Sequence, residues 1–311
     1  MGHGVKLAAL LLLIFPAVRG ATYYVIIAGL GGSPEYEAQF TQWAKDLDGE
    51  LRSNGPGAHV ETLCGNSASQ QRVREVLARV AAQSRPEDAF GLLLIGHGTF
   101  DGADYKINLP GPDLTANELA SLLNRIPAAR QLVVNMTSAS GASLAALARK
   151  HRIVITATKS GNEKNATVFA RYWVDALRDS GADAEKNGSI SALEAYRYAE
   201  RKTAAYFETE KLLATEHSML SDTGAAPGVR DPKPENGQGL LAAAFPLLRP
   251  QNETGKNGTP EKGRLLAKKE DIEAKIDRLK YQKAALTPDE YKQQLTVLLL
   301  ELARTQAEID R

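Results

Sequence analysis

The sequence predicts an α/β protein in which a mostly parallel sheet is sandwiched by helices, followed by a C-terminal α-helical hairpin. Between residues 22 and 158, short and continuously apolar runs alternate with segments in which apolar residues have helical spacing. Strands that are apolar along their whole length are typical of parallel sheets covered on both faces. Near the C-terminus, helical spacing continues on both sides of Thr287, Pro288 and Glu290, which form the capping-box pattern of a second helix.

The apolar runs predict strands, in chain order, at residues 22–29, 59–63, 89–98, 130–136 and 152–158. Besides a longer helix after residue 189, helical spacing predicts helices at residues 34–51, 67–83, 115–126, 143–151 and 165–177. We expect Ser33 and Ser67 to cap the first two helices. Because ligands bind beyond the carboxyl ends of the strands in such sheets, the site is expected where glycine- and hydroxyl-rich segments follow strands, at residues 29–32, 96–98, 137–141 and 158–161.

Residues 1–20 have the pattern of a secretory signal peptide. Lys6 precedes the apolar run of residues 7–18, and small residues follow at Gly20 and Ala21. We expect cleavage near Gly20–Ala21 and a mature chain that is secreted or periplasmic. The apolar run is short for a bilayer span and contains Pro16, so no stable membrane anchor is expected.

The rest of the chain divides into three predicted parts. Residues 21–224 form the α/β domain, and residues 225–263 are a Pro/Gly-rich linker whose apolar segment 240–248 is expected to clip onto the domain. Residues 264–311 form the helical hairpin, with the 3/4 spacing of a coiled coil. The hairpin is interpreted either as an element of self-association or as a hairpin folded against its own domain.

The overall charge and the cysteine count exclude some functions. The formal net charge is +1, from 38 basic and 37 acidic residues. There is no basic stripe with interleaved aromatic residues, so nucleic acid is not an expected partner. The single cysteine, Cys64, excludes an intrachain disulfide.

Two of the strand ends carry side chains that hydrolytic chemistry uses. His97 follows the third strand between two glycines, and Ser138 follows the fourth strand in the segment Thr137-Ser138-Ala139-Ser140-Gly141. The flanking glycines indicate a close approach to the backbone, and the N–H of Gly98 is a candidate oxyanion donor. A serine and a histidine at one edge of a sheet are a possible nucleophile and base.

The order of these elements resembles the legumain and caspase-like cysteine peptidases, from about Tyr23 to Thr167. That family carries His-Gly after its third strand and the catalytic cysteine after its fourth, in legumains within Glu-Ala-Cys-Glu-Ser-Gly. The resemblance implies a caspase-hemoglobinase-like fold in which His97 is the general base and Ser138 replaces the cysteine. It also implies an oxyanion hole from the N–H groups of Ser138 and Gly98, and a peptide or protein ligand in the groove.

The resemblance also implies a specificity loop after the fifth strand, in which Lys159 and Glu163 are candidate substrate-binding residues. Other positions depart from the family. Gly31 stands where legumains have an asparagine that orients the histidine. Glu37 and Ala38 stand where the family has a basic pair that lines the pocket for the substrate side chain.

These departures matter because a serine hydroxyl needs an oriented base, whereas a cysteine thiol near pKa 8.5 is already partly ionised beside a histidine. Asp101, Asp104 or Glu163 could orient His97 from another direction. We interpret the chain as a degenerate peptidase, a pseudoenzyme with a peptide-binding or scaffold role. The alternatives are an active hydrolase that uses a Ser138–His97 dyad and an adaptor that oligomerises through its helical tail.

Residues 183–194 have the pattern of an EF-hand-like calcium loop, with Gly188 at the sharp turn. The candidate oxygen ligands are Asp183, Glu185, Asn187, Ser189 through its carbonyl, Ser191 and Glu194. Glu185 departs from the usual Asp or Asn at the third position, and its longer side chain would weaken or distort the site. A single loop indicates a structural role for calcium. The alternative is a polar loop in which Ser189 or Ser191 caps the next helix.

Overall fold

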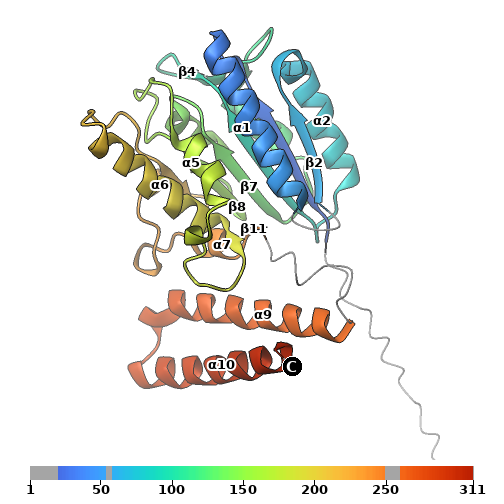
Figure 1. The fold of residues 1–311 in the computed structure, drawn as a ribbon, viewed down its shortest axis with the longest axis vertical. Coiled ribbons are helices and arrows are strands. Elements are labelled where there is room, and N and C mark those ends of the chain that lie inside the picture. Colours follow the sequence, from blue (N-terminus) through green and yellow to red (C-terminus); the bar gives the residue numbers. More distant parts are fainter. Residues whose placement is uncertain (1–19, 54–57, 249–259, 311) are drawn as a thin grey trace, which may run out of the picture.

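The computed structural model describes residues 20–53, 58–248 and 260–310, and it confirms the predicted fold class (Figure 1). A central sheet lies between helices, and a helical hairpin lies at one end of this body. Residues 1–19 of the predicted signal peptide lie outside the described residues. Among the described helices, none has the length and hydropathy needed to cross a membrane.

The central sheet has six strands in the order β10-β8-β7-β3-β1-β2. Five of them are parallel and are the strands that the apolar runs predict: β1 (Thr22–Ala28), β2 (Ala58–Leu63), β3 (Ala89–Ile95), β7 (Arg130–Asn135) and β8 (Arg152–Thr156). The sixth, β10 (Met219–Ser221), pairs antiparallel with β8 and was not predicted.

Helices cover both faces of the sheet because successive side chains of a strand point to opposite sides. Ile26 belongs to the buried cluster on the face that carries α1 (Pro34–Ser53), α5 (Phe169–Ala176) and α6 (Ala192–Thr209). Ile27, the next residue of β1, belongs to the cluster on the other face, with α2 (Gln70–Gln83), α3 (Ala116–Leu123) and α4 (Leu144–Leu147).

The helix predictions were wrong in detail at α2, at α4 and at α5, which begins at Phe169 and not at residue 165. Ser67 lies in a 3₁₀ turn, and the cap of α2 is Ser69, whose Oγ accepts from the N–H of Arg72 at 3.3 Å. Helix α4 ends at Leu147, short of the predicted end at residue 151. The chain leaves the helix at Ala148 and turns at His151, where φ is 68°.

A second, three-stranded sheet follows β3 at the carboxyl edge of the main sheet, at the top of Figure 1. Its antiparallel strands are β4 (Gly98–Phe100), β5 (Tyr105–Ile107) and β6 (Leu114–Thr115). The N–H of Asn108 donates to the carbonyl of His97 at 3.1 Å. This small sheet therefore holds the backbone on which His97 and Gly98 lie.

The predicted linker contains ordered elements that contact the domain. Helix α7 (Leu240–Ala243) precedes β11 (Pro246–Leu248), which pairs antiparallel with β9 (Ile190–Ser191). The carboxylate of Asp222 accepts the N–H groups of Gly239 and Leu241 at 2.9 and 2.8 Å. The apolar segment thus joins the domain as a short helix and an edge strand.

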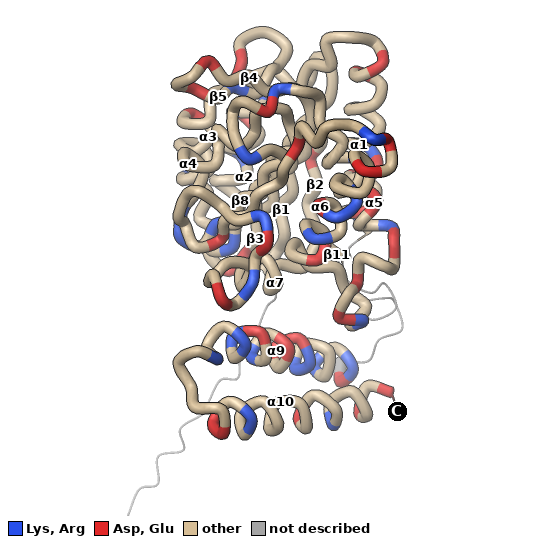
Figure 2. The backbone as a smooth tube through the Cα atoms, turned by 90° about the vertical axis from the view of Figure 1, so that its left-hand side faces the viewer, with Lys and Arg blue, Asp and Glu red and all other residues tan. Residues whose placement is uncertain are grey.

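The hairpin consists of α9 (Pro260–Gln282) and α10 (Pro288–Ile309), and the predicted capping box of Thr287 and Glu290 is present. Figure 2 shows α9 next to the body and α10 on its far side. The hydroxyl of Tyr281 donates to the carbonyl of Gln238 at 2.7 Å. The hairpin therefore contacts its own domain through α9.

The first described residues are held at the amino edge of the sheet. The N–H of Ala21 donates to Oδ1 of Asp88 at 2.7 Å, and the N–H of Arg85 donates to Oδ2 at the same distance. Asp88 is buried. Its carboxylate thereby joins the start of β1 to the turn that precedes β3.

Candidate functional site

The hydroxyl of Ser138 contacts the backbone of Gly98 at the carboxyl edge of the sheet. Its Oγ accepts from the Gly98 N–H at 3.0 Å and donates to the Gly98 carbonyl at 3.1 Å, and the residue is 2% exposed. A Cβ on Gly98 would lie 2.6 Å from the Ser138 carbonyl oxygen, so this approach requires glycine. The Gly98 N–H, a candidate oxyanion donor, is here engaged by the Ser138 hydroxyl.

A buried polar network fixes the turn around Ser138. Oδ1 of Asn135 accepts from the hydroxyl of Thr137 at 2.9 Å, and its amide donates to Ser143 Oγ at 3.0 Å. The hydroxyl of Tyr105 lies 2.5 Å from that of Thr137, and burial raises the pKa of Tyr105 to about 12. Ala139 has a φ of 54°, a left-handed conformation that is uncommon for a residue with a side chain. The network holds this strained turn in one conformation.

The ring of His97 packs among aromatic side chains of α1. Its centroid lies 5.1 Å from that of Tyr36 and 5.2 Å from that of Phe40, both in edge-on geometry. Among the described residues, the ring of His97 has no hydrogen-bonding side chain. The loops that carry His97 and Ser138 are therefore in contact, because Gly98, the residue after His97, is hydrogen-bonded to Ser138. The side chains of His97 and Ser138 are not hydrogen-bonded to each other.

Of the three positions that depart from the legumain pattern, Gly31 precedes α1, and Glu37 and Ala38 lie in the first turns of α1. Oε2 of Glu37 accepts the N–H of Gly31 at 2.8 Å. A Cβ on Gly31 would lie 2.3 Å from the backbone nitrogen of Glu37, so this loop lies directly on the helix. Ala38 is exposed. An acidic side chain thus supports the first glycine loop where the family pattern has a basic pair.

Asp101 and Asp104, two of the acidic residues that could orient His97, form hydrogen bonds within their own loop. The carboxylate of Asp101 accepts the N–H groups of Asp104 and Ala103 at 2.8 and 3.0 Å, and these hydrogen bonds lower its pKa to about 2. Asp104 is exposed, and its backbone closes this turn. Both carboxylates thus belong to the loop between β4 and β5.

Glu163 orients a different histidine, His217. Its Oε1 lies 2.5 Å from His217 Nδ1, and its Oε2 accepts the N–H of Lys159 at 2.8 Å. The backbone carbonyl of Glu163 accepts the N–H of Ala139 at 2.7 Å. The loop after β8 is therefore attached both to the Ser138 turn and to the segment before β10. Lys159 is exposed, with its Nζ 3.7 Å from Glu163.

The His217–Glu163 pair was missed at the sequence level. The two residues lie 54 positions apart, and no spacing rule connects them. The neighbouring Glu216 is 5% exposed and accepts the N–H groups of Val168 and Phe169 at 2.9 and 2.8 Å, at the start of α5. Burial raises the pKa of Glu216 to about 7 despite these two donors.

Two large apolar side chains lie exposed at the carboxyl edge of the sheet. Leu30, within the first glycine loop of residues 29–32, is 40% exposed, and Tyr36 of α1 is 37% exposed. Tyr36 contacts the His97 ring directly. The carboxyl edge therefore presents apolar surface to solvent next to the imidazole, as a binding site for an apolar side chain would.

The loop of residues 183–194 directs its oxygen atoms at its own backbone. The carboxylate of Asp183 accepts the N–H groups of Asn187 and Gly188 at 3.1 and 2.8 Å. Oε1 of Glu194 accepts from the N–H of Ala184 at 3.0 Å, and its Oε2 from the Ser191 hydroxyl at 2.8 Å. Ser191 caps α6 in a capping box with Glu194.

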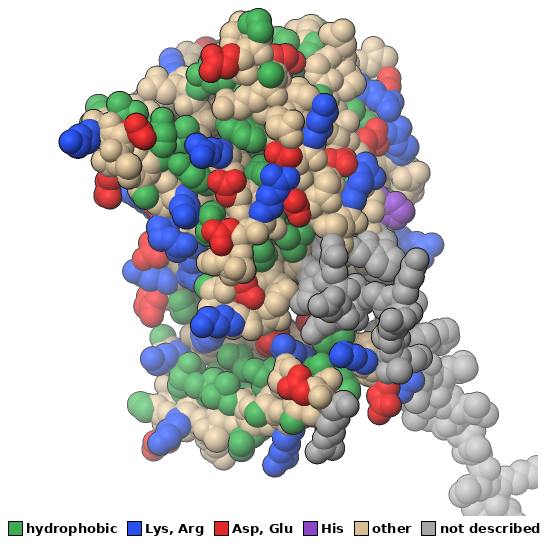
Figure 3. All heavy atoms as spheres, in the orientation of Figure 1, with side chains coloured by type: hydrophobic (Ala, Val, Ile, Leu, Met, Phe, Trp, Pro, Cys, Tyr) green, Lys and Arg blue, Asp and Glu red, His purple; other side chains and the backbone are tan. Residues whose placement is uncertain are grey.

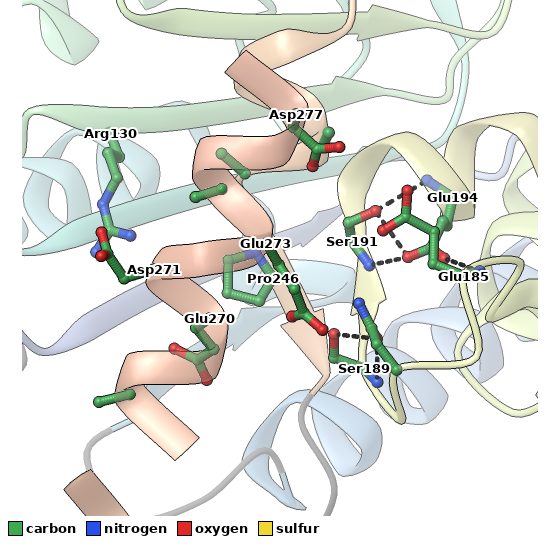
Figure 4. Close-up of a pocket in the computed structure, with 15 residues that line it drawn as sticks. Arg130, Glu185, Ser189, Ser191, Glu194, Pro246, Glu270, Asp271, Glu273 and Asp277 are labelled. Atoms are coloured by element: carbon green, nitrogen blue, oxygen red, sulfur yellow. Dashed lines mark hydrogen bonds between the residues drawn. The ribbon is translucent and has the colours of Figure 1, made fainter. Parts of the chain in front are cut away.

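A cavity of about 340 Å³ separates this loop from α9. Figure 4 shows Glu273 extending from α9 toward Ser189, with Glu185 and Glu194 on the loop side. Glu270, Asp271 and Asp277 also line the cavity. Oxygen ligands of the type that calcium prefers are present, but no group of three or more His, Cys, Asp or Glu side chains converges on one point among the described residues.

Comparisons with known proteins give similarity of shape only. No family model and no curated protein matches the sequence. One similar structure is protein GSU0716 from Geobacter sulfurreducens, at 15% identity and a TM-score of 0.44, over 68% of this chain and 95% of that one. The Drosophila initiator caspase Dronc has 12% identity and a TM-score of 0.42, over 66% of this chain and 80% of that one. Caspase-1 from Spodoptera frugiperda has 12% identity and a TM-score of 0.45, over 66% and 86%.

Proposed function

We propose that the chain is a degenerate legumain/caspase-like protein that binds a peptide segment at the carboxyl edge of its sheet and does not cleave it. The observation that carries the proposal is the pairing of the Ser138 hydroxyl with both backbone groups of Gly98. A nucleophilic serine must donate to a base that a third group orients. Here the hydroxyl donates to a carbonyl, and the nearby carboxylate of Glu163 binds His217.

The peptide-binding part of the proposal rests on the exposed surface beside His97. Leu30 and Tyr36 offer apolar contact area, and Tyr36 combines a flat ring with a polar tip. The exposed side chain of Lys159 follows β8 at the same edge, where it could contact a carbonyl or carboxylate of the peptide. We expect an extended segment with an apolar side chain to be the preferred ligand.

The decisive experiment is covalent labelling together with peptide binding. The mature chain is incubated with a fluorophosphonate probe and with a peptide library, beside the variants Ser138→Ala and His97→Ala. We expect no labelling and no cleavage by any of the three proteins. Labelling or cleavage that both substitutions abolish would establish the active-hydrolase alternative and exclude the degenerate one.

Peptide binding is then measured separately from chemistry. The peptides from the library that bind to the parent chain are titrated against the variant Tyr36→Ala. The control variant is Tyr291→Ala, which removes a tyrosine from the hairpin instead. We expect affinity to fall about tenfold or more for Tyr36→Ala alone, since a contact aromatic contributes on the order of 1–2 kcal/mol. If no peptide is retained, or if both variants bind as the parent does, the site beside His97 is not a peptide site.

A second candidate function is that of an adaptor that associates with a second copy through its hairpin. Val297, Leu299 and Leu300 of α10 are 60%, 47% and 54% exposed, on a helix whose other face packs on α9. Figure 3 shows hydrophobic side chains gathered along the hairpin. We expect light scattering to report a dimer or larger assembly that Val297→Ser/Leu300→Ser converts to monomer. A monomeric parent chain would exclude this role.

We also propose that the loop of residues 183–194 binds calcium in a structural role. Its oxygen-rich side chains and its turn at Gly188, where φ is 82°, support the assignment. We expect calcium to raise the melting temperature of the parent chain and not that of Asp183→Ala. Identical melting with calcium and with chelator would remove calcium from the function.

We propose, finally, that the chain is exported and processed near Gly20–Ala21. The support is the sequence of residues 1–20, most of which lie outside the described residues. N-terminal sequencing of the protein recovered outside the cytoplasm checks this, with Ala21 as the expected first residue. Recovery of the uncleaved chain inside the cell alone would contradict it.

A further inference from the structure

A basic cavity of about 300 Å³ lies at the amino edge of the sheet, beside the starts of β7 and β8. It lies at the opposite edge of the sheet from Ser138, which follows the carboxyl end of β7. Arg149, Lys150, His151 and Arg152 line it, and the described residues of its lining include no aspartate or glutamate. Its size is at the lower end of the range for ligand pockets, which suits a small ion or a small charged group.

Arg152 is a buried cation without an anionic partner among the described residues. It is 2% exposed, and its guanidinium donates to Gln131 Oε1 at 2.9 Å, to the Leu147 carbonyl at 3.0 Å and to Asn124 Oδ1 at 2.9 Å. All three acceptors are neutral. Burial, together with the positive charge of Arg149, lowers the pKa of Arg152 to about 10. A buried charge is ordinarily paired, because desolvation disfavours it otherwise.

Two guanidinium groups converge on one neutral oxygen atom. Oδ1 of Asn124 accepts from Arg149 Nη1 at 2.7 Å as well as from Arg152 Nη2 at 2.9 Å. Like charges that share an acceptor repel each other, and no described carboxylate offsets this repulsion. An oxyanion in the cavity would supply the missing negative charge and accept the remaining N–H groups in the planar geometry that guanidinium favours.

We propose that this cavity binds a phosphate-type oxyanion, either inorganic phosphate or the phosphate group of a small monoester. Two arginines and a lysine around one cavity match an anion of nearly two charges with three acceptor oxygens better than a single carboxylate. The competing interpretation is that Arg152 only joins α3 and α4 to β7 through its neutral acceptors. That interpretation predicts no ligand.

The test is calorimetric titration of the mature chain with inorganic phosphate, glycerol phosphate and acetate in chloride buffer. Replacing Arg152 could prevent folding, so the cavity variant is Arg149→Gln/Lys150→Gln, which changes two exposed side chains. The matched control, Arg171→Gln/Lys211→Gln, removes the same two charges from exposed positions outside the lining. We expect saturable phosphate binding that weakens about tenfold or more in the cavity variant and stays unchanged in the control.

The comparison of ligands identifies the source of the phosphate. Tighter binding of glycerol phosphate than of inorganic phosphate would assign the site to monoesters, and the reverse order would assign it to the free ion. Acetate binding as tight as phosphate binding would overturn the phosphate assignment. Absence of saturable binding, or equal weakening in the cavity variant and the control, would overturn the site itself.

Discussion

At the scale of single residues, Glu216 couples the region behind the candidate site to pH. Its pKa is raised by burial to about 7, above the ordinary glutamate value of 4.5. A raised pKa in the folded state means that its contribution to stability is fully present below about pH 4.5. That contribution is lost as the pH rises through about 7.

We therefore expect Glu216→Gln to make the free energy of unfolding less dependent on pH between about 4.5 and 7. The difference between the variant and the parent should change across this interval by roughly 3 kcal/mol, since each pKa unit corresponds to about 1.4 kcal/mol. Urea unfolding at several pH values measures it. The exposed Glu208→Gln is the control for net charge, and parallel pH profiles for all three proteins would refute the assignment.

At this scale the sequence predicted which loops lie together better than it predicted the contacts of their side chains. The loops of His97 and Ser138 were predicted to meet, and Gly98 indeed contacts Ser138. The direction of the hydroxyl could not be predicted, because it depends on a backbone approach that only the folded turn creates. The His217–Glu163 pair was equally inaccessible, since two loops bring it together and neither has a recognisable motif.

At the scale of elements, the contact between α9 and the loop of residues 183–194 is expected to depend on pH. Burial raises the pKa of Glu273 to about 7, and the pKa of Glu185 is raised in the same direction. The charged groups that act on Glu273 are Lys269, Glu270 and Asp277 on α9 and Glu185 on the loop. The other charged residues at this interface are Glu194, Asp271, Lys280 and Arg130. Acidic groups therefore outnumber basic ones.

We expect the hairpin to dock most firmly below about pH 4.5 and to loosen as the pH rises through about 7, because docking favours protonated Glu273. Small-angle scattering of the mature chain at pH 5 and pH 8 should show a larger radius of gyration at the higher pH. Glu273→Gln should remain compact at both values. A parent chain of constant radius would show that docking does not involve this carboxyl group.

The elements themselves could be predicted to different degrees. The parallel strands β1, β3, β7 and β8 were recognisable because consecutive apolar residues place apolar side chains on both of their faces. Helix α10 was recognisable because its capping box and Pro288 mark its start. The strands β4, β5 and β6 were missed because each has only two or three residues, too few for a period of two to be visible. Ser67 was taken as a cap because a serine at either position satisfies the same pattern.

At the scale of the whole molecule, the two edges of the sheet have different chemistry. The carboxyl edge carries the candidate peptide site at His97 and Ser138, where exposed apolar side chains lie together with the charged side chains of Lys159 and Glu163. The amino edge carries the basic cavity at Arg152 and the hairpin contact. Parallel strands place all their amino ends on one side, so a ligand at the amino edge and one at the carboxyl edge bind without competing for space.

The hydrogen bond between the Ala21 N–H and Asp88 has a consequence for maturation. If processing releases the chain between Gly20 and Ala21, the donor becomes a charged α-ammonium group 2.7 Å from a buried carboxylate. The contact, which joins an amide to a carboxylate in the uncleaved chain, would then join two opposite charges, and these attract each other more strongly. Cleavage would then strengthen the fold, and the precursor would be the less stable form.

Thermal unfolding of a chain that begins at Ala21, compared with one that begins at Gly20, measures this gain. Asp88→Asn should remove most of the difference between the two chains. Equal melting temperatures before the substitution would show that the new terminus adds nothing. If the gain is present, removal of the leader adds to the stability of the chain, and the processed form is the more stable of the two.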